Sequence, residues 1–253
     1  MIYIKTQKEI DLIRESCRIV AETLRLVKSN VRVGVTTLEL DLIAEDYIRS
    51  NDAIPAFKGY SQGGLPGFPG SVCISINDAV VHGIPGQIKL EEGDLISLDV
   101  GVLKNNYYGD AAITVANGKV SDEKRMLLEV TEKSLQLGIE QAKSGNRVHD
   151  ISAAVQDYVE QNGFSIVRDL CGHGVGKFLH EDPAIPNFGR RGTGAKLKRG
   201  MTLAIEPMVN AGGYEVITSS DGWTVLTADG SPSAHFEHTV LILDNSPEIL
   251  TVC

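Results

Sequence analysis

Five residues of the kinds that bind metal ions or carry protons interrupt apolar or glycine-rich stretches of this sequence. Four are carboxylates and one is a histidine. They are Asp99, Asp110, His173, Glu206 and Glu237. If the fold brings the four carboxylates together, their mutual repulsion needs compensation, and two divalent cations would supply it. The residue types therefore predict a metal site.

Two of the acids lie in a predicted β-hairpin. Residues 95–103 and 107–115 alternate in polarity and are rich in β-branched or aromatic side chains, while residues 104–106 are typical of a turn. With the turn centred between the first two of those three residues, Asp99 and Asp110 face each other across the strands, where like charges destabilise a pair. A bound cation or a shared proton would offset the repulsion. The alternative is a solvated, charged strand face.

The other three residues come from separate segments. His173 lies in LCGHGVGKFLHEDPAIP, where the glycines allow close approach of the backbone, and His180 follows seven residues later. Glu206 interrupts the apolar segment LAIEP. Glu237 lies in SAHFEHTVLIL, where strand alternation places it on the same face as His235. We therefore expect the second half of the chain to complete the site begun by the hairpin.

Composition and charge exclude several classes of protein. The chain has 253 residues, 42% of them hydrophobic and 23% charged, which is ordinary for a soluble globular protein. A formal net charge of −9 argues against nucleic acid as the main ligand, and the basic stretch at residues 190–199 is better interpreted as a solvated loop. The four cysteines are far apart, and neither an apolar leader nor a membrane-length apolar run is present. These features predict a cytoplasmic protein without membrane contact.

Two pairs of similar segments indicate an internal duplication. KLEEGDLISLD (89–99) resembles KLKRGMTLAIE (196–206), and upstream of each, DYIRSN (46–51) resembles DYVEQN (157–162). Because both matches occur in the same order, they predict one domain made of two related halves, about 1–120 and 121–253.

The pattern of elements predicts an α+β fold. Apolar residues at helical spacing run through residues 7–28, and a capping box at 36–39 opens a second helix to about residue 50. The second half offers helices at 122–143 and 150–162. Strands follow the helices in both halves, so we expect helices to cover one face of a largely antiparallel sheet. The loop at 58–70, rich in glycine and proline, is expected at the surface near the mouth of the site.

In this order and spacing, the five residues resemble those of the methionine aminopeptidases of the pita-bread metallopeptidase superfamily. The matching motifs are the two aspartates eleven residues apart, GHGVG, AIEP and FEHTV. The segment SVCISINDAVVHGIP is also similar to the family segment that carries its first active-site histidine, here His82. The resemblance covers about residues 4–251 and implies a pseudo-twofold antiparallel sheet covered by helices. With no extra N-terminal domain, zinc-binding extension or large insertion, the chain looks like the short, type I, bacterial-style enzyme.

The resemblance implies a role for each proposed metal ligand. Asp110 and Glu237 would bridge two divalent ions, Asp99 would chelate one of them, and His173 and Glu206 would bind the other. An oxygen-rich set of ligands suits manganese or iron(II), with cobalt or zinc able to substitute. Two such ions activate water for hydrolysis of a peptide bond.

The resemblance also implies catalytic and substrate-binding residues. Glu206 would carry the proton, while His82 and His180 would contact the peptide amide and the developing oxyanion. The pocket for the methionine side chain would be lined by Tyr60, Phe68, Cys73, Leu179 and Trp223. Two positions depart from the family pattern: Leu179 stands where an aromatic residue is common, and His235 replaces a frequent glutamine.

The implied function is removal of the N-terminal methionine from new polypeptides near the ribosome, by a monomeric enzyme. A related aminopeptidase or proline-directed peptidase of the same fold is the first alternative. A binding protein that kept the fold and lost catalysis is the second. A third alternative, from the residues alone, is a cysteine–histidine pair formed by Cys171 and His173, which would share a strand face.

Overall fold

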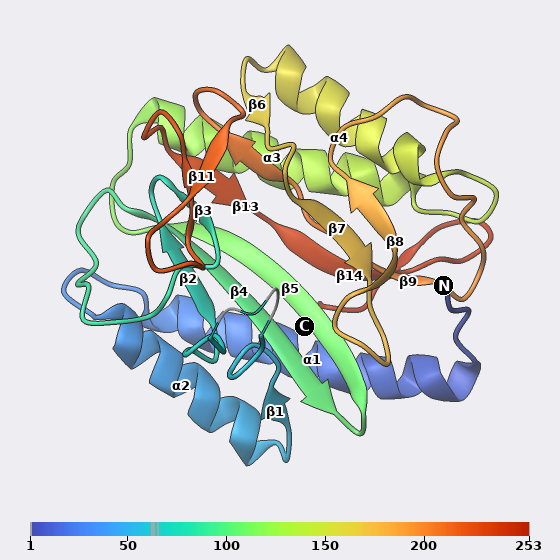
Figure 1. Ribbon diagram of the computed structural model, residues 1–253, viewed down its shortest axis with the longest axis horizontal. Coiled ribbons are helices and arrows are strands. Elements are labelled where there is room, and N and C mark those ends of the chain that lie inside the picture. Colours follow the sequence, from blue (N-terminus) through green and yellow to red (C-terminus); the bar gives the residue numbers. More distant parts are fainter. Residues whose placement is uncertain (1, 62–63, 65, 253) are drawn as a thin grey trace.

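A nine-stranded antiparallel sheet organises the computed structural model, which describes residues 2–61, 64 and 66–252 (Figure 1). Along the sheet the strands run in the order β1 (Ile54–Pro55), β4 (Leu95–Lys104), β5 (Tyr107–Ala116), β14 (Glu237–Leu241), β9 (Thr202–Ile205), β7 (Cys171–Gly174) and β8 (Glu181–Pro186). Two further strands, β2 (Cys73–Ile76) and β15 (Glu248–Ile249), pair with β4 and β14. The strands of the first and second halves therefore meet where β5 pairs with β14.

Two three-stranded sheets complete the strand structure of the described residues. One contains β13 (Ser233–His235), β10 (Met208–Asn210) and β6 (Ser165–Ile166). The other contains β11 (Val216–Thr218), β12 (Val225–Thr227) and β3 (Ala79–Val81). The second sheet brings the end of β3 beside the turn that precedes β12. This sheet thus combines a strand from the first half of the chain, β3, with two strands from the second half, β11 and β12.

The described residues form four helices, which lie in two antiparallel pairs, one pair for each half of the chain (Figure 1). They are α1 (Gln7–Asn30), α2 (Thr37–Ser50), α3 (Asp122–Gln141) and α4 (Val148–Gln161). The predicted capping box is confirmed: the backbone N–H of Glu39 donates to the Thr36 hydroxyl at 3.1 Å, and the Glu39 carboxylate accepts the Thr36 N–H at 2.7 Å. The four helices predicted from apolar spacing are confirmed to within two residues at each end.

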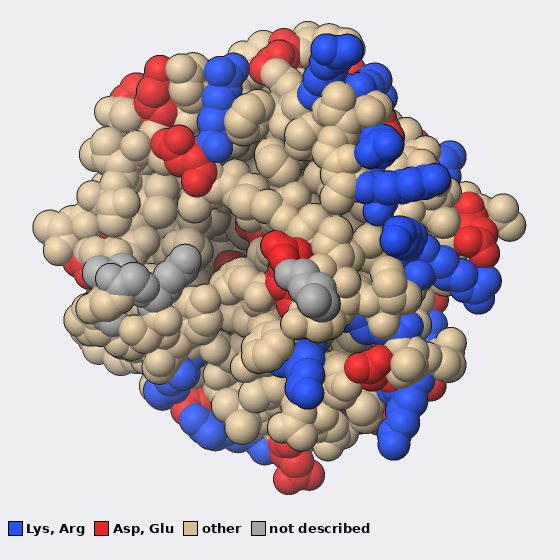
Figure 2. All heavy atoms as spheres, turned by 45° about the vertical axis from the view of Figure 1, so that its right-hand side comes forward, with Lys and Arg blue, Asp and Glu red and all other residues tan. Residues whose placement is uncertain are grey.

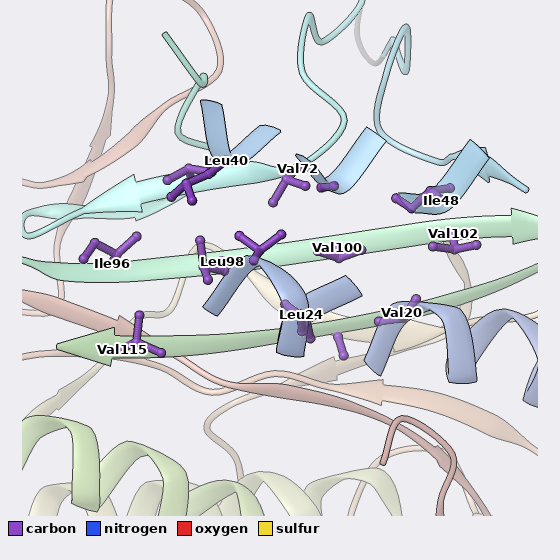
Figure 3. Packing of buried hydrophobic residues seen from close by; sticks show 14 of the residues in the cluster. Val20, Leu24, Leu40, Ile48, Val72, Ile96, Leu98, Val100, Val102 and Val115 are labelled. Carbon is purple, nitrogen blue, oxygen red and sulfur yellow. The ribbon is translucent and has the colours of Figure 1, made fainter. Parts of the chain in front are cut away.

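The helices pack on one face of the large sheet. In the first half, α1 and α2 cover the apolar side of β4, as Figure 3 shows for Val20, Leu24, Leu40, Ile48, Ile96, Leu98, Val100 and Val102. In the second half, α3 and α4 cover β8, β9 and β14 through Leu135, Ile139, Ile151, Ile185, Leu203, Ile205 and Val240. Because side chains alternate along a strand, the acids between these apolar positions point to the opposite face. The predicted α+β arrangement is confirmed.

The register of the hairpin differs from the expected one. The turn consists of Asn105 and Asn106, both with positive φ (51° and 64°), so β4 and β5 are aligned with Gly101 opposite Asp110. Asparagine tolerates this left-handed conformation, which two-residue hairpin turns require. Asp99 is therefore opposite Ala112, diagonal to Asp110 on the same face. The two carboxylates remain neighbours, but they are not directly opposed.

The two halves of the chain make matching contacts at the start of their second helices. Thr36, before α2, forms an antiparallel bridge with Lys89, and Arg147, before α4, forms the same bridge with Lys196. Lys89 and Lys196 are the first residues of the two similar segments found in the sequence. On these matched contacts we propose that the chain is one domain of two related halves.

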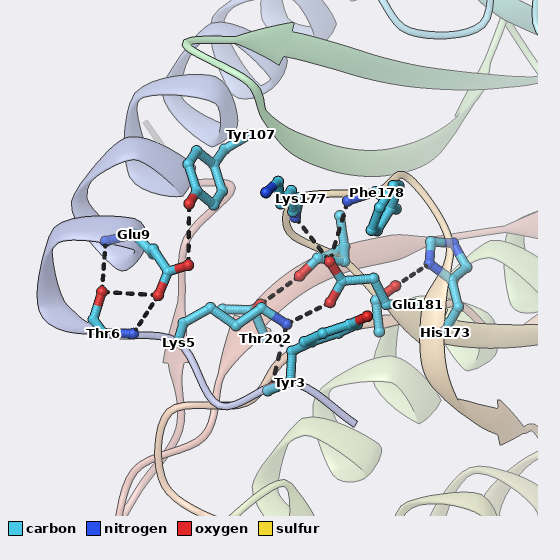
Figure 4. A network of polar contacts seen from close by, with 12 residues as sticks. Tyr3, Lys5, Thr6, Glu9, Tyr107, His173, Lys177, Phe178, Glu181 and Thr202 are labelled. Atoms are coloured by element: carbon cyan, nitrogen blue, oxygen red, sulfur yellow. Dashed lines mark hydrogen bonds and ion pairs between the residues drawn. The ribbon is translucent and has the colours of Figure 1, made fainter. Parts of the chain in front are cut away.

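A buried ion pair fixes the N-terminal segment to the loop between β7 and β8 (Figure 4). The Lys5 ammonium lies 2.7 Å from the Glu181 carboxylate, and their side chains are only 5% and 1% exposed. The other carboxylate oxygen accepts the backbone N–H groups of Lys177 and Phe178 at 2.8 and 3.1 Å. Glu181 therefore joins the loop to a part of the chain 176 residues away.

Replacing Lys5 with methionine should destabilise the fold strongly, because it leaves the Glu181 carboxylate buried without its cation. The expected loss in the free energy of unfolding is about 3 to 5 kcal/mol. Lys58→Met is the matched control, because Lys58 pairs with Glu45 at 2.5 Å but is 41% exposed, and exposed pairs contribute less than ~1 kcal/mol. Urea unfolding of both variants measures the difference. Equal losses would contradict a structural role for the buried pair.

Candidate metal and substrate site

A cavity of 660 Å³ opens on the face of the sheet opposite the helices. Figure 2 shows a hollow in the molecular surface, with acidic side-chain atoms visible inside it. Every residue that the sequence predicted for the site lines this cavity: Tyr60, Phe68, Cys73, His82, Asp99, Asp110, His173, Leu179, His180, Glu206, Trp223 and Glu237. The fold thus brings together residues that are up to 177 positions apart in the chain, from Tyr60 to Glu237.

Three adjacent strands place the acidic side chains at the inner end of the cavity. Ala112, in the middle of β5, is aligned with Asp99 on β4 and with Glu237 on β14. Asp110 lies two residues from Ala112 and therefore points to the same face. A methyl group between the two longer acids leaves their carboxylates room to converge. The strand register, rather than any loop, sets this arrangement.

His173 completes a group of potential metal ligands with Asp110 and Glu237, whose ligand atoms all lie within 4.8 Å of one another. Its Nε2 atom is 3.9 Å from an Asp110 oxygen and 3.5 Å from a Glu206 oxygen. Its Nδ1 atom lies 2.9 Å from the carbonyl oxygen of Gly174. Since a carbonyl only accepts, Nδ1 carries the proton, and the Nε2 lone pair faces the acids.

Three of the carboxylates are incompletely hydrogen-bonded. Among the described residues, no donor reaches one oxygen each of Asp99, Asp110 and Glu237, although all three oxygens are buried. Asp110 and Glu237 are only 3% and 2% exposed. Burying an anionic oxygen away from water without a hydrogen-bond donor raises the free energy of the folded state, and bound divalent cations would compensate the charge. The donor set therefore fits bound divalent metal.

The protonation of the metal-free cluster follows from its burial. Burial raises the pKa of Asp99 to about 7 and that of Glu206 to about 8. Burial first, and neighbouring acids second, raise the pKa values of Asp110 and Glu237 well above the ordinary range. Burial also lowers the pKa of His173 to about 3. Without cations, the cluster therefore favours neutral acids around a neutral imidazole.

The two predicted catalytic histidines line the cavity from separate segments of the chain. His82 follows β3 with a left-handed backbone (φ 58°), and burial lowers its pKa to about 4. The Nδ1 atom of His180 lies 2.8 Å from the Tyr60 hydroxyl, and its ring centroid lies 4.4 Å from that of His173. Burial lowers the pKa of His180 as well. Both imidazoles are therefore neutral near pH 7 and offer N–H donors to a ligand in the cavity.

His235 is also part of the acidic end of the site. Its Nε2 atom lies 3.5 Å from a Glu206 oxygen, and the side chain is almost fully buried. Neither ring nitrogen has a hydrogen-bond partner among the described residues. Glu206 therefore lies between two imidazoles, those of His173 and His235. The contact between His235 and Glu206 arises because this sequence has histidine at position 235, where the family often has glutamine.

The predicted methionine pocket forms an apolar wall beside the carboxylates. Phe68 packs edge-on against Trp223, with ring centroids 5.5 Å apart, and the Trp223 indole N–H donates to the Pro66 carbonyl at 3.1 Å. Cys73 and Leu179 pack in the same apolar cluster. Burial raises the pKa of the Cys73 thiol well above its ordinary value. The thiol is therefore an uncharged part of the wall rather than a nucleophile.

Cys171 lies at the exposed part of the cavity lining. Partial burial raises the pKa of its thiol, which opposes the formation of a thiolate. Both ring nitrogens of His173 already face other groups, the Gly174 carbonyl and the acids. These contacts favour a metal ligand at His173 over the cysteine–histidine alternative.

Several cavity residues were missed in the sequence. They include Tyr3, Phe57, Asp169, Leu170, Phe178 and Asp182. Phe178 precedes Leu179, so its proximity to the site could have been found from the motif itself. Tyr3 gives no local signal, because the Lys5–Glu181 pair, which joins distant segments, brings the N-terminal segment to the cavity.

Comparison with known proteins gives consistent matches over the whole chain. Residues 11–244 match the model of metallopeptidase family M24. The methionine aminopeptidase of Clostridium perfringens is 55% identical, over 100% of this chain and 99% of the relative. The solved structure of methionine aminopeptidase from Thermotoga maritima superposes with a TM-score of 0.96 at 44% identity, covering 100% of both chains. Prolidase from Pyrococcus furiosus shares the fold, with a TM-score of 0.78 at 23% identity, and the match covers 99% of this chain and 65% of the prolidase chain.

The stability of the metal-free protein should fall as the pH rises from about 7 to about 8, the folded-state pKa of Glu206. Unfolded Asp and Glu lose their protons near pH 4, whereas Asp99 and Glu206 in the fold keep theirs to about pH 7 and 8. The folded state then binds more protons than the unfolded state, so the free energy of unfolding decreases with pH. The buried His82 and His173 do not titrate over this range in the fold, since burial lowers their pKa values to about 4 and about 3. Thermal unfolding in chelator measures the effect.

Glu206→Gln provides the control for this prediction, because the amide cannot titrate. Its midpoint of unfolding in chelator should decline less with pH than that of the unaltered chain. A midpoint that rises with pH in the unaltered chain would contradict the assigned protonation.

Proposed function

We propose a function that follows from family membership: the chain belongs to metallopeptidase family M24, among the methionine aminopeptidases. It is a metal-dependent aminopeptidase that removes the N-terminal methionine from polypeptides. The observation that carries this proposal is the set of buried carboxylate oxygens without donors at the inner end of a cavity that also has an apolar wall. A hydrolytic centre and a side-chain pocket are thereby joined in one site.

We propose that the site holds two divalent ions. Asp110 and Glu237 would be shared by both ions, Asp99 would bind one, and His173 and Glu206 would bind the other. When bound, the ions would activate water and polarise the scissile carbonyl. The mixture of carboxylates with one imidazole suits manganese or iron(II), and cobalt or zinc could substitute.

The chain's own residues would move the proton and orient the substrate. Glu206 would accept the proton of the attacking water on a carboxylate oxygen and pass it to the leaving amine. His180 would donate an N–H from Nε2, since the Tyr60 hydroxyl lies at its Nδ1. His82 would also donate an N–H to the peptide. Because desolvation lowers the pKa of both imidazoles, they would stabilise the developing oxyanion as neutral donors without competing for the proton.

The apolar wall would select methionine at the N-terminus. Phe68, Cys73, Leu179 and Trp223 are uncharged, and aromatic and sulfur-containing groups make favourable contacts with a thioether. Tyr60 would close the pocket on the side of His180. Leu179, in place of an aromatic residue, would leave this part of the pocket less rigid.

The cellular setting belongs to the same proposal. The substrates would be new polypeptides at or near the ribosome in the cytoplasm, and the enzyme would act as a monomer. None of the described helices combines the length and the apolar composition needed to cross a membrane. The cavity is lined by acids rather than by basic side chains, which agrees with a peptide amine as the ligand and not a nucleic acid.

A panel of three peptides tests the specificity. With manganese bound, the enzyme should release methionine from Met-Ala-Ser and leave Leu-Ala-Ser and Ala-Pro-Ser intact, because the apolar wall fits an unbranched thioether. Mass spectrometry of the products measures this. Preferential cleavage of Ala-Pro-Ser would assign the chain to the proline-directed peptidases instead. No cleavage with metal bound would favour the binding-protein alternative.

Asp110→Asn tests the metal site with little change of shape. Removing one anionic charge from the centre of the cluster should lower metal affinity and reduce kcat on Met-Ala-Ser at least about 100-fold, since even supporting groups of a metal site affect it by 10- to 100-fold. Asp122→Asn, at an exposed position of α3, is the control. Titration calorimetry with manganese should give two ions per chain for the control. Full activity of Asp110→Asn in chelator would contradict a metal mechanism.

A further inference from the structure

The cavity extends beyond the carboxylates and the methionine pocket to a rim that those roles do not explain. At this rim lie Tyr3, from the N-terminal segment, and Phe178, from the loop between β7 and β8. Tyr3 is 46% exposed and Phe178 is 56% exposed, and both still contribute to the cavity lining. Large aromatic side chains half in solvent at the edge of a binding cavity are typical of contact surfaces.

The buried ion pair holds both aromatic residues in place. Glu181 accepts the backbone N–H of Phe178 at 3.1 Å, while the Lys5 ammonium lies 3.5 Å from the Tyr3 carbonyl. In Figure 4 the side chains of Tyr3 and Phe178 flank the Lys5–Glu181 pair. Ile2 adds a bridge to Asp182 in β8. The rim is therefore a preorganised surface, although it is built from two distant segments.

We propose that Tyr3 and Phe178 bind the substrate residues that follow the methionine and its immediate neighbour. This inference rests on the proposed function. If the amine end of a polypeptide occupies the inner, acidic end of the cavity, then the rest of the chain must leave through the open end, and the rim is continuous with it. Aromatic faces there favour apolar or aromatic side chains at the third and fourth substrate positions.

A comparison of short and long substrates tests the proposal. With the manganese-loaded enzyme, kcat/KM is measured for Met-Ala and for Met-Ala-Phe-Leu, and the ratio of the longer to the shorter substrate is the readout. A general loss of activity affects both substrates and cancels in the ratio. Tyr3→Ala and Phe178→Ala should each lower the ratio about fivefold, the effect expected from losing contact with one or two methylene-sized groups.

Two further variants keep the test specific. Tyr3→Phe, which retains the ring, should retain the ratio of the unaltered enzyme. Met126→Ala, at a 52% exposed position of α3 outside the cavity lining, should leave both the ratio and the activity unchanged. Cleavage of both peptides with the same ratio in Tyr3→Ala, Phe178→Ala and the unaltered enzyme would overturn the proposed rim. Failure of the unaltered enzyme to cleave either peptide would instead overturn the proposed function, and the rim proposal with it.

Discussion

The structure depends on the burial of like-charged carboxylates on one face of an antiparallel sheet. Asp99, Asp110 and Glu237 lie on three adjacent strands around Ala112, with oxygens that no described donor reaches. The repulsion among these carboxylates opposes the pairing of their strands, so the apolar packing of the helices on the other face must stabilise the sheet. A protein without cations can hold this cluster only in protonated form, as the raised pKa values of the acids indicate. Folding and metal binding are therefore coupled through the same side chains.

The proposed arrangement in two related halves would explain why the acidic face is assembled from both parts of the chain. Each half supplies two helices and strands to one sheet, and the halves join where β5 pairs with β14. The first half supplies the two aspartates, while the second supplies His173, Glu206 and Glu237. Neither half contains the whole proposed ligand set, so the proposed metal site lies at the seam between them. Loops then add the histidines and the apolar wall around it.

Much of this could be predicted from the sequence, because the relevant signals are local. Capping residues and apolar spacing predicted the helices, and strand alternation predicted that Asp99 and Asp110 share a face. The error in hairpin register arose because the turn depends on which residues adopt positive φ, and Asn105 and Asn106 do so together. The order of the five ligands reflects a family resemblance rather than local physics. The contribution of Tyr3 was not predictable, because one ion pair across 176 residues places it.

The Lys5–Glu181 ion pair lies between two parts of the cavity that meet different requirements of an aminopeptidase site. The inner end of the cavity has to be exact in geometry, and strand register provides this through neighbouring positions on β4, β5 and β14. The outer end has to accept polypeptides of many sequences, and half-exposed side chains on a braced loop suit that need better than a packed wall. Glu181 connects the two ends, since it follows His180 in the chain and accepts the backbone N–H groups of Lys177 and Phe178. The buried Glu181 carboxylate thus helps to fix both His180, a proposed catalytic residue, and Phe178, at the rim where the proposed substrate chain would leave the cavity.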